Sequence, residues 1–526
     1  MKIAPKYRPL FCLIIVSSII RILIASLVEL GNDEVYYFTY ALFPDLSHFD
    51  HPPMLGWMIQ LFSLDMFLKS QFLLRLPAIV FAVLNTWLIF ELGQKIKDEK
   101  TGFYAAVLYT ASIYTSIIAG VFIMPDSPQV FFWVLSLYLM FDVLPDKEIS
   151  SISKRKILLL GAVIGLGMLS KYTSVFLWLG IFIFLISNNR KWFKSLSLYA
   201  SGLISLLVFS PVLLWNERHH FISFTFHEDR VNMMGSGIRF DFIGTEILGE
   251  FLYQNPVVFV LIWLAVVYGI KHRNSILDRE KLQILLAQSL PLIAVFLFFS
   301  LFRKTLPHWT GPAYISLILI AAAYLSHKNK EQILFPKVLK AALITAFFVV
   351  GVGFAQINYG LIDLKKIVGQ DLTLDMYGWR KLSAPFGQIK DKAEAEKLIQ
   401  KNAPIISYRW FPAAHIDYYV ALPNNSYVLG LGSLERIHKY AWINQARGDF
   451  QLGMDAWYLA FDYDYVSPDF LEPYFEQIIS TDTITIMRSN SIAKEVYVYL
   501  LKDMVKIPKN DFQAFMQKAK EEPSEK

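Results

Sequence analysis

Long apolar runs are the feature that most constrains how this chain of 526 residues can fold. A helix needs about 20 predominantly apolar residues to cross the hydrocarbon core of a bilayer. Runs of roughly this kind lie near 9–30, 72–92, 102–121, 128–145, 157–171, 173–187, 195–215, 251–270, 283–302, 310–326 and 338–359. With 55% hydrophobic and only 18% charged residues, the sequence predicts an α-helical multi-pass membrane protein with about eleven transmembrane helices.

Clusters of lysine and arginine occupy every second loop between these runs, for example at 95–100, 154–156 and 190–194. The positive-inside rule predicts that these loops and the N-terminus are cytoplasmic. The same clusters account for the net charge of +6, so we assign no nucleic-acid partner. The first run follows basic residues as a signal peptide would, but its length and the lack of a small-residue cleavage pattern favour a retained helix.

The tail differs in pattern from the rest of the chain, and an odd number of spans places it outside. Strand-like segments at 426–431, 482–489 and 495–501 accompany an expected helix at 391–402, which indicates a small extracytoplasmic α+β domain. We therefore predict a transmembrane domain at 1–359, with a first external loop at 31–71, and a C-terminal domain at 360–526. The final "KAKEEPSEK" is expected to be frayed.

Acidic residues gather in the first external loop, "GNDEVYYFTYALFPDLSHFDHPPMLGW" at 31–57. Asp33 and Glu34 follow the first apolar run, where a carboxylate could take the proton from an attacking hydroxyl. Asp50 and His51 precede a double proline that can open a helix. A phosphate could bind there with His51, or a cation with Asp50. The alternative is that these residues are hydrated loop charges that cap helix ends.

Three further external residues have two readings each. Asp126 in "MPDSP" is either the N-cap of the fourth span or a functional acid. Lys171 and Tyr172 are either a snorkelling lysine beside an interfacial tyrosine or a phosphate-binding pair. The local sequence does not decide between these readings.

Arg303, Lys304 and His308 form a strongly basic turn on the predicted external side, against the positive-inside trend. This turn indicates an anionic partner. A second group could be read as metal ligands, but its spacing matches no zinc motif and favours a solvated loop; it comprises His219, His220, His227, Glu228 and Asp229. Neither a P-loop nor a dinucleotide fingerprint is present, so a nucleotide-driven mechanism has no support.

The motifs "NDEVYYFTYA", "LSHFDHPPMLGW", "MPDSPQVFFW" and "GLGMLSKYTSVFLWLG" occur in this order within about the first 180 residues. Together they resemble the bacterial membrane glycosyltransferases of the protein O-mannosyltransferase and aminoarabinose-transferase superfamily, which has the GT-C fold of family 39 type. The later "FRKTLPHWTGPAY" is similar to a family segment that helps to hold the lipid donor.

The resemblance implies roles for individual residues. Asp33 matches the aspartate proposed as catalytic base, and Glu34 is its motif neighbour. Asp50 and Asp126 match two acids at a metal position, so a divalent ion is an expected helper. His51 stands where an aminoarabinose transferase has a lysine that contacts donor phosphate, so its charge at neutral pH is not assured.

The resemblance further implies transfer of a sugar from polyprenyl phosphate, undecaprenyl phosphate in bacteria, to a lipid, glycan or protein acceptor outside the inner membrane. Such a donor is already activated, so the reaction needs no nucleotide, only a base and positive charge for the leaving phosphate. The residues expected at the phosphate are His51, Lys171, Tyr172, Arg303, Lys304 and His308. We expect inversion at the anomeric carbon. The rival reading is a transporter, but the acids fall at external helix ends and not at the bilayer midplane.

Overall fold

The computed structural model describes residues 4–231, 237–272, 274–329 and 335–508, so the tail that was expected to be frayed lies outside it. The chain forms two compact units, which are described separately. The first consists of Met1–Ala25, Asp45–Ser47 and His51–Gly351. The second consists of Ser26–Pro44, His48–Asp50 and Val352–Lys526. Two short pieces of the predicted first loop thus group with the C-terminal part of the chain.

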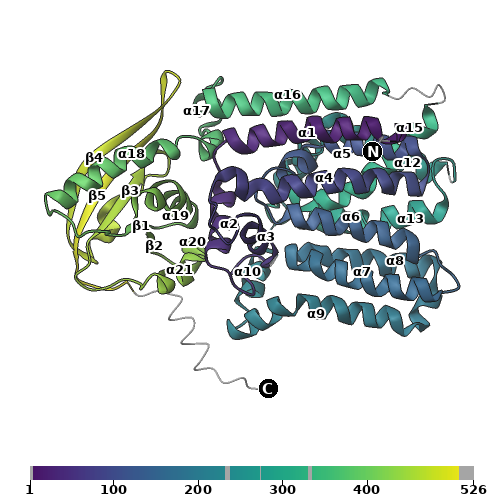
Figure 1. Ribbon diagram of the computed structural model, residues 1–526, viewed down its shortest axis with the longest axis horizontal. Helices are drawn as coiled ribbons and strands as arrows, with labels where there is room; N and C mark the ends of the chain where they lie inside the picture. Colours follow the sequence, from purple (N-terminus) through teal and green to yellow (C-terminus); the bar gives the residue numbers. More distant parts are fainter. Residues whose placement is uncertain (1–3, 232–236, 273, 330–334, 509–526) are drawn as a thin grey trace. The chain divides into compact units, whose positions relative to one another are not determined.

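The first unit is helical (Figure 1). Its helices, two of which continue into the second unit, are α1 (Arg8–Leu27), α3 (Met54–Phe62), α4 (Gln71–Ile96), α5 (Glu99–Ala111), α6 (Asp126–Val143), α7 (Ser151–Ser170), α8 (Phe176–Asn188), α9 (Leu196–Arg218), α10 (Ile222–Val231), α11 (Phe240–Tyr253), α12 (Pro256–Lys271), α13 (Arg279–Ala287), α14 (Leu290–Phe299), α15 (Gly311–Lys328) and α16 (Lys337–Tyr359).

Small residues allow the central helices to pack closely. Helices α4, α6, α7 and α9 run side by side in sequence order (Figure 1). A Cβ added at Gly161 of α7 would lie 2.2 Å from the carbonyl oxygen of Ser201 in α9. A Cβ added at Gly93 of α4 would lie 2.5 Å from the Cα of Gly102 in α5. Glycine at these positions therefore brings backbones into contact, as is common between membrane helices.

Among the described residues, six helices are long and apolar enough to cross a membrane, and a bent pair can supply a seventh. The protein is a multi-pass membrane protein, while the count of about eleven spans stays a prediction. Two expected spans are interrupted. The run 102–121 breaks after Ala111 and continues as a π-helical turn at Tyr114–Ile118, and the run 283–302 divides into α13 and α14.

The stretch 216–250, which the predicted spans 195–215 and 251–270 leave as a connection, is largely helical. Helices α10 and α11 occupy most of its described residues, and α11 meets α12 at an angle of 103°. Asn255 makes this bend, because its backbone has a φ of 69° and its side chain caps α12 by accepting from the N–H of Val257.

The second unit joins helices to a mixed sheet. Its strands follow the order β2-β1-β3-β5-β4, with β1 parallel to β2 and β3, and β5 antiparallel to β3 and β4. The strands are β1 (Ile405–Ser407), β2 (Val428–Gly430), β3 (Ala456–Phe461), β4 (Phe475–Arg488) and β5 (Ser491–Met504). The helices are α2 (Asn32–Leu42), α17 (Leu364–Val368), α18 (Ser383–Ala395), α19 (Trp410–Ile416), α20 (Leu434–Ile437) and α21 (Tyr440–Ala446).

The α+β composition expected for the tail agrees with this sheet, but several elements differ. The three expected strands correspond to β2, β4 and β5, while β1 and β3 were missed. Strand β3 is buried along its whole length, so it shows no alternation of apolar and polar residues. The helix expected at 391–402 lies instead at 383–395. It stops because the chain turns at Lys397, which has a φ of 58°.

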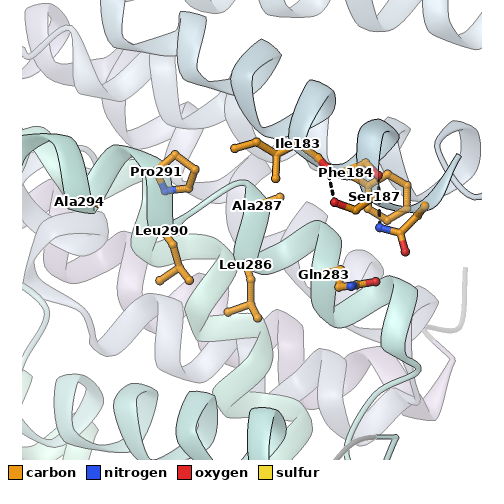
Figure 2. A pocket seen from close by; sticks show the side chains of 10 residues that line it. Ile183, Phe184, Ser187, Gln283, Leu286, Ala287, Leu290, Pro291 and Ala294 are labelled. Atoms are coloured by element: carbon orange, nitrogen blue, oxygen red, sulfur yellow. Dashed lines mark hydrogen bonds between the residues drawn. The ribbon is translucent and has the colours of Figure 1, made fainter. Parts of the chain in front are cut away.

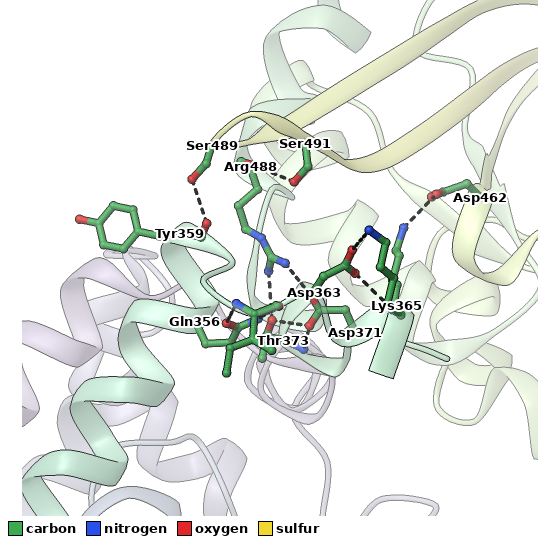
Figure 3. Close-up of polar contacts among 12 residues, drawn as sticks. Gln356, Tyr359, Asp363, Lys365, Asp371, Thr373, Asp462, Arg488, Ser489 and Ser491 are labelled. Carbon is green, nitrogen blue, oxygen red and sulfur yellow. Dashed lines mark hydrogen bonds and ion pairs between the residues drawn. The ribbon is translucent and has the colours of Figure 1, made fainter. Parts of the chain in front are cut away.

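A buried ion pair ties the β4–β5 hairpin to the segment after α16 (Figure 3). The Arg488 guanidinium donates to Asp371 and, at 3.0 Å, to the hydroxyl of Thr373. Burial raises the pKa of the Asp371 carboxyl, but the hydrogen bonds from Thr373 and Arg488 and the charge of Arg488 together hold that pKa below its usual value. A Cβ at Gly360 would lie 2.5 Å from the guanidinium, and the φ of 62° there also favours glycine.

We predict that Arg488→Met destabilises the second unit, because it leaves a buried carboxylate without its cation. The expected loss is ~3 kcal/mol, read as a lower thermal midpoint and faster proteolysis of the C-terminal part. The control is Lys366→Met, which removes a largely exposed pair with Asp363 and should change little. Equal effects of the two variants would contradict the assignment.

Candidate functional site

The predicted site residues divide between the two units. The second unit contains the acids Asp33, Glu34 and Asp50. The first unit contains the others, which are His51, Asp126, Lys171, Tyr172, Arg303, Lys304 and His308.

Asp126 and Lys171 form a buried ion pair in the first unit. The Lys171 Nζ lies 2.8 Å from Asp126 Oδ2, and the Tyr114 hydroxyl donates to Asp126 Oδ1 at 2.8 Å. The carboxylate is fully buried and does not cap α6, since the N-cap position is Pro125. The capping alternative for Asp126 was therefore wrong. So was the snorkelling alternative for Lys171, whose side chain is 8% exposed.

The segment that contains the basic turn 303–308 is held by two acids of α11 that the sequence did not single out. Thr305 donates to Glu246 at 2.7 Å, and Thr310 donates to Glu250 at 2.6 Å. His308, within this segment, interacts electrostatically with both Asp126 and Lys171. Buried acids within a membrane helix are costly, which makes α11 part of the candidate site.

The other predicted phosphate ligands have varied surroundings. Lys304 is exposed and Arg303 is partly buried. His51 and Tyr172 both approach His227 of α10, with ring-centre distances of 6.4 and 5.3 Å. His51 and Tyr172, which lie far apart in the sequence, therefore share His227 as a neighbour.

Asp33 and Glu34 have opposite environments within α2. The Glu34 carboxylate is 2% exposed and accepts a hydrogen bond from the Gly31 N–H at 3.0 Å, which satisfies a free backbone donor at the start of the helix. Asp33 is exposed. A base that takes a proton from an acceptor must be reachable, so the geometry favours Asp33 over Glu34 for that role.

Asp50 is anchored by two tyrosines. The hydroxyl groups of Tyr36 and Tyr40 both donate to Asp50 Oδ1, the first at 2.9 Å. Burial and the charge of Asp50 raise the pKa of both tyrosines well above 10, so they remain hydrogen-bond donors. These tyrosines, four residues apart on one face of α2, were missed, although the spacing in "YYFTY" is a helical signal.

Lys439, from the C-terminal part, reaches the same loop. Its Nζ donates to the carbonyl of Phe43 at 2.5 Å and lies 3.0 Å from Nδ1 of His48. No local pattern predicts this contact, because the residues lie almost 400 positions apart.

The two acids expected at a divalent ion already have hydrogen-bond partners in their own units. Both oxygens of Asp126 accept hydrogen bonds from groups of this chain, and Asp50 Oδ1 accepts two. Within the described residues, no group of three or more His, Cys, Asp or Glu side chains could hold a metal. A metal at Asp50 and Asp126 stays a prediction, and we derive no chemical step through it.

A cavity of about 390 Å³ lies between α8 and the α13–α14 segment (Figure 2). Its lining is mostly apolar and includes the amide of Asn188, and the hydroxyl of Ser187 and the amide of Gln283 lie at one end (Figure 2). No ionisable side chain and no predicted site residue lines it, so this cavity has no means to perform acid–base chemistry.

The chain is similar to several known proteins. Residues 50–215 match the family described as dolichyl-phosphate-mannose-protein mannosyltransferase. The structure of ArnT from Cupriavidus metallidurans bound to undecaprenyl phosphate matches at a TM-score of 0.61 and 14% identity. The match covers 93% of this chain and 97% of that one. The chain has an ArnT-like fold. The apo structure of the same ArnT matches equally.

A curated relative is the lipid A galacturonosyltransferase RgtD of Rhizobium johnstonii, which is 22% identical over 293 residues. The match covers 55% of this chain and 59% of that relative. The resemblance to the GT-C glycosyltransferases is thus confirmed. The roles of the individual site residues stay predictions.

We predict that Lys171→Met lowers the thermal midpoint of the detergent-purified protein. The expected loss is ~3 kcal/mol, because the buried Asp126 carboxylate would lose its cation. Lys304→Met, which removes an exposed lysine, is the matched control and should leave the midpoint unchanged. The double variant Lys171→Met/Asp126→Asn should recover part of the loss; no recovery would show that the two residues do not act as a pair.

Proposed function

We propose that the chain is a glycosyltransferase that moves a sugar from a polyprenyl-phosphate donor, undecaprenyl phosphate in bacteria, to an acceptor hydroxyl on the extracytoplasmic face. The observation that carries the proposal is the ArnT-like fold over 93% of the chain, together with an exposed Asp33 at the start of α2. The ArnT structure was solved with undecaprenyl phosphate, which supports a donor of this class.

The proposed chemistry needs two functions from this chain. The Asp33 carboxylate accepts the proton of the acceptor hydroxyl as its oxygen attacks the anomeric carbon. The sugar–phosphate bond breaks, and the leaving polyprenyl phosphate takes both bonding electrons. Positive charge then stabilises that phosphate. The candidate groups are Lys304, Arg303 and Lys171. Lys171 would have to leave its ion pair with Asp126 in order to bind the phosphate.

The acceptor is proposed only by class. RgtD is named for transfer to lipid A, so a lipid acceptor is one choice, and a surface glycan or a secreted protein are the others. Each presents a hydroxyl group, and the mechanism above applies to all three.

The decisive experiment is sugar transfer by purified protein in detergent, with a series of polyprenyl-phosphate sugars and a cell-envelope acceptor extract. Asp33→Asn should reduce kcat by ~100-fold or more while donor binding persists, because it removes the base. Asp65→Asn is the matched control, since Asp65 is an exposed acid of the same loop whose carboxylate accepts from Gln60. This variant should retain wild-type activity.

Each other outcome has a meaning. Full activity of Asp33→Asn would move the base to another residue. Absence of transfer from every donor, without any ion gradient, would overturn the proposal and favour the transporter reading.

A second prediction concerns stereochemistry. Direct displacement by the acceptor inverts the anomeric carbon, so the product should carry the anomer opposite to that of the donor. Nuclear magnetic resonance of the purified product can assign it. A covalent glycosyl-enzyme trapped on the protein would contradict direct displacement.

A further inference from the structure

The residues before Asp33 are tied to the C-terminal part of the same unit. The Glu29 carboxylate accepts hydrogen bonds from the backbone N–H groups of Trp379 at 2.8 Å and Arg380 at 3.3 Å. The N–H of Leu30 donates to the hydroxyl of Tyr419 at 2.6 Å. The chain therefore enters α2 along a path that the C-terminal residues define.

Asn32, directly before Asp33, is clamped at both ends of its amide. Its Nδ2 donates to Asp375 Oδ2 at 2.9 Å, and its Oδ1 lies 2.9 Å from Nε2 of His415. Because Asp375 can only accept when ionised, the amide nitrogen faces Asp375 and the amide oxygen faces the histidine. One orientation of the side chain satisfies both partners.

This arrangement also fixes the tautomer of His415. The ring must carry its hydrogen on Nε2 to donate to Asn32, and Nδ1 has no hydrogen-bond partner among the described residues. Burial holds the pKa of His415 well below 6.5, so the ring stays neutral. The ring stacks on Trp379 at 4.0 Å with an interplanar angle of 5°, which prevents it from turning away from Asn32.

Lys494 of β5 completes the cluster. Its buried Nζ lies 3.6 Å from the ring centre of Trp379 and interacts electrostatically with Glu29 and Asp375. Nζ makes no hydrogen bond within the described part of the chain, and burial lowers its pKa to about 7, so in its charged form it acts on Glu29 and Asp375 through electrostatics alone. It opposes the rise in the pKa of Asp375 that burial causes, which favours the ionised form that Asn32 requires.

The clamp exceeds what the helix needs in order to begin. At the start of α2, Glu34 already accepts from the N–H of the N-cap residue Gly31. The hydrogen bonds of Asn32 are separate from this cap, and they fix the backbone next to Asp33. Asp33 itself is exposed.

We propose that Asn32, clamped between Asp375 and His415, is a positioning residue that fixes the direction of the Asp33 carboxylate toward the acceptor. The inference rests on the proposed role of Asp33 as base. It makes the C-terminal part of the chain a component of the catalytic apparatus, because Asp375 and His415 come from there. Misplacement of a catalytic group by about 1 Å can cost ~100-fold in rate, so a clamp of this kind matters for kcat.

The test uses full-length protein with three substitutions. His415→Phe keeps the ring stack on Trp379 and removes the Nε2 hydrogen, and Asn32→Leu removes the amide at similar volume. His415→Gln is the conservative variant, because its amide can still donate. Asn424→Leu is the matched control, because the Asn424 amide likewise joins two segments of this unit. It donates to the backbone carbonyls of Ser383 and Val420.

We expect Asn32→Leu and His415→Phe to lower kcat by ~10-fold or more and to leave the donor KM within ~2-fold, because binding is not affected. His415→Gln should recover most of the activity. In hydrogen exchange, the backbone amides of 30–40 should exchange ~10-fold faster in the two damaging variants. Asn424→Leu should leave both kcat and this exchange unchanged, even where it lowers the thermal midpoint.

Wild-type kcat in Asn32→Leu, or an equal fall in Asn424→Leu, would overturn the proposal and reduce the clamp to a structural contact. Failure of the proposed function is separate, since the wild-type protein would then transfer no sugar from any donor. In that case the exchange measurement still decides: unchanged exchange in Asn32→Leu overturns the clamp, and faster exchange supports it.

Discussion

Burial of charge is the constraint on which the rest of this structure depends. A buried carboxylate or amine needs an opposite charge or several hydrogen bonds, because desolvation otherwise costs several kcal/mol. Asp126 meets this need with Lys171 and Tyr114 in the first unit. In the second unit, Asp371 is paired with Arg488. Each ion pair joins two segments that are separated in the sequence. Asp126 and Lys171, which are predicted site residues, therefore also hold their two helices together.

The same constraint explains why the candidate residues are not equivalent. Glu34 and Asp50 are buried and already accept hydrogen bonds from their own unit, whereas Asp33 is exposed. A proton acceptor has to meet its substrate, while its neighbours have to stay fixed. With the proposed role of Asp33, these tasks fall to two consecutive residues of α2, the exposed Asp33 and the buried Glu34.

The sequence predicted the parts of the fold that depend on local pattern. Apolar runs gave the membrane helices, and the double proline marked the start of α3 at Met54. Local sequence pattern did not predict the features that depend on contacts between residues far apart in the chain. The segment of α2 was predicted to be part of a loop, because it contains acids and tyrosines. Tyr36 and Tyr40 can be buried in this helix because their hydroxyl groups donate to Asp50. Asn32 has no local signal at all, since its partners Asp375 and His415 lie more than 300 residues away.

This dependence on distant partners changes how the C-terminal part should be understood. A domain that only selected acceptors could be exchanged without effect on the first loop. Here α2 belongs to the same compact unit as the sheet, and β5 supplies Lys494 to the cluster around Asn32. The long β4–β5 hairpin also holds Asp371 and Thr373, which begin the 3-10 helix that carries Asp375. The path from hairpin to Asp33 is continuous, so the sheet and the first loop have to be treated as one functional element.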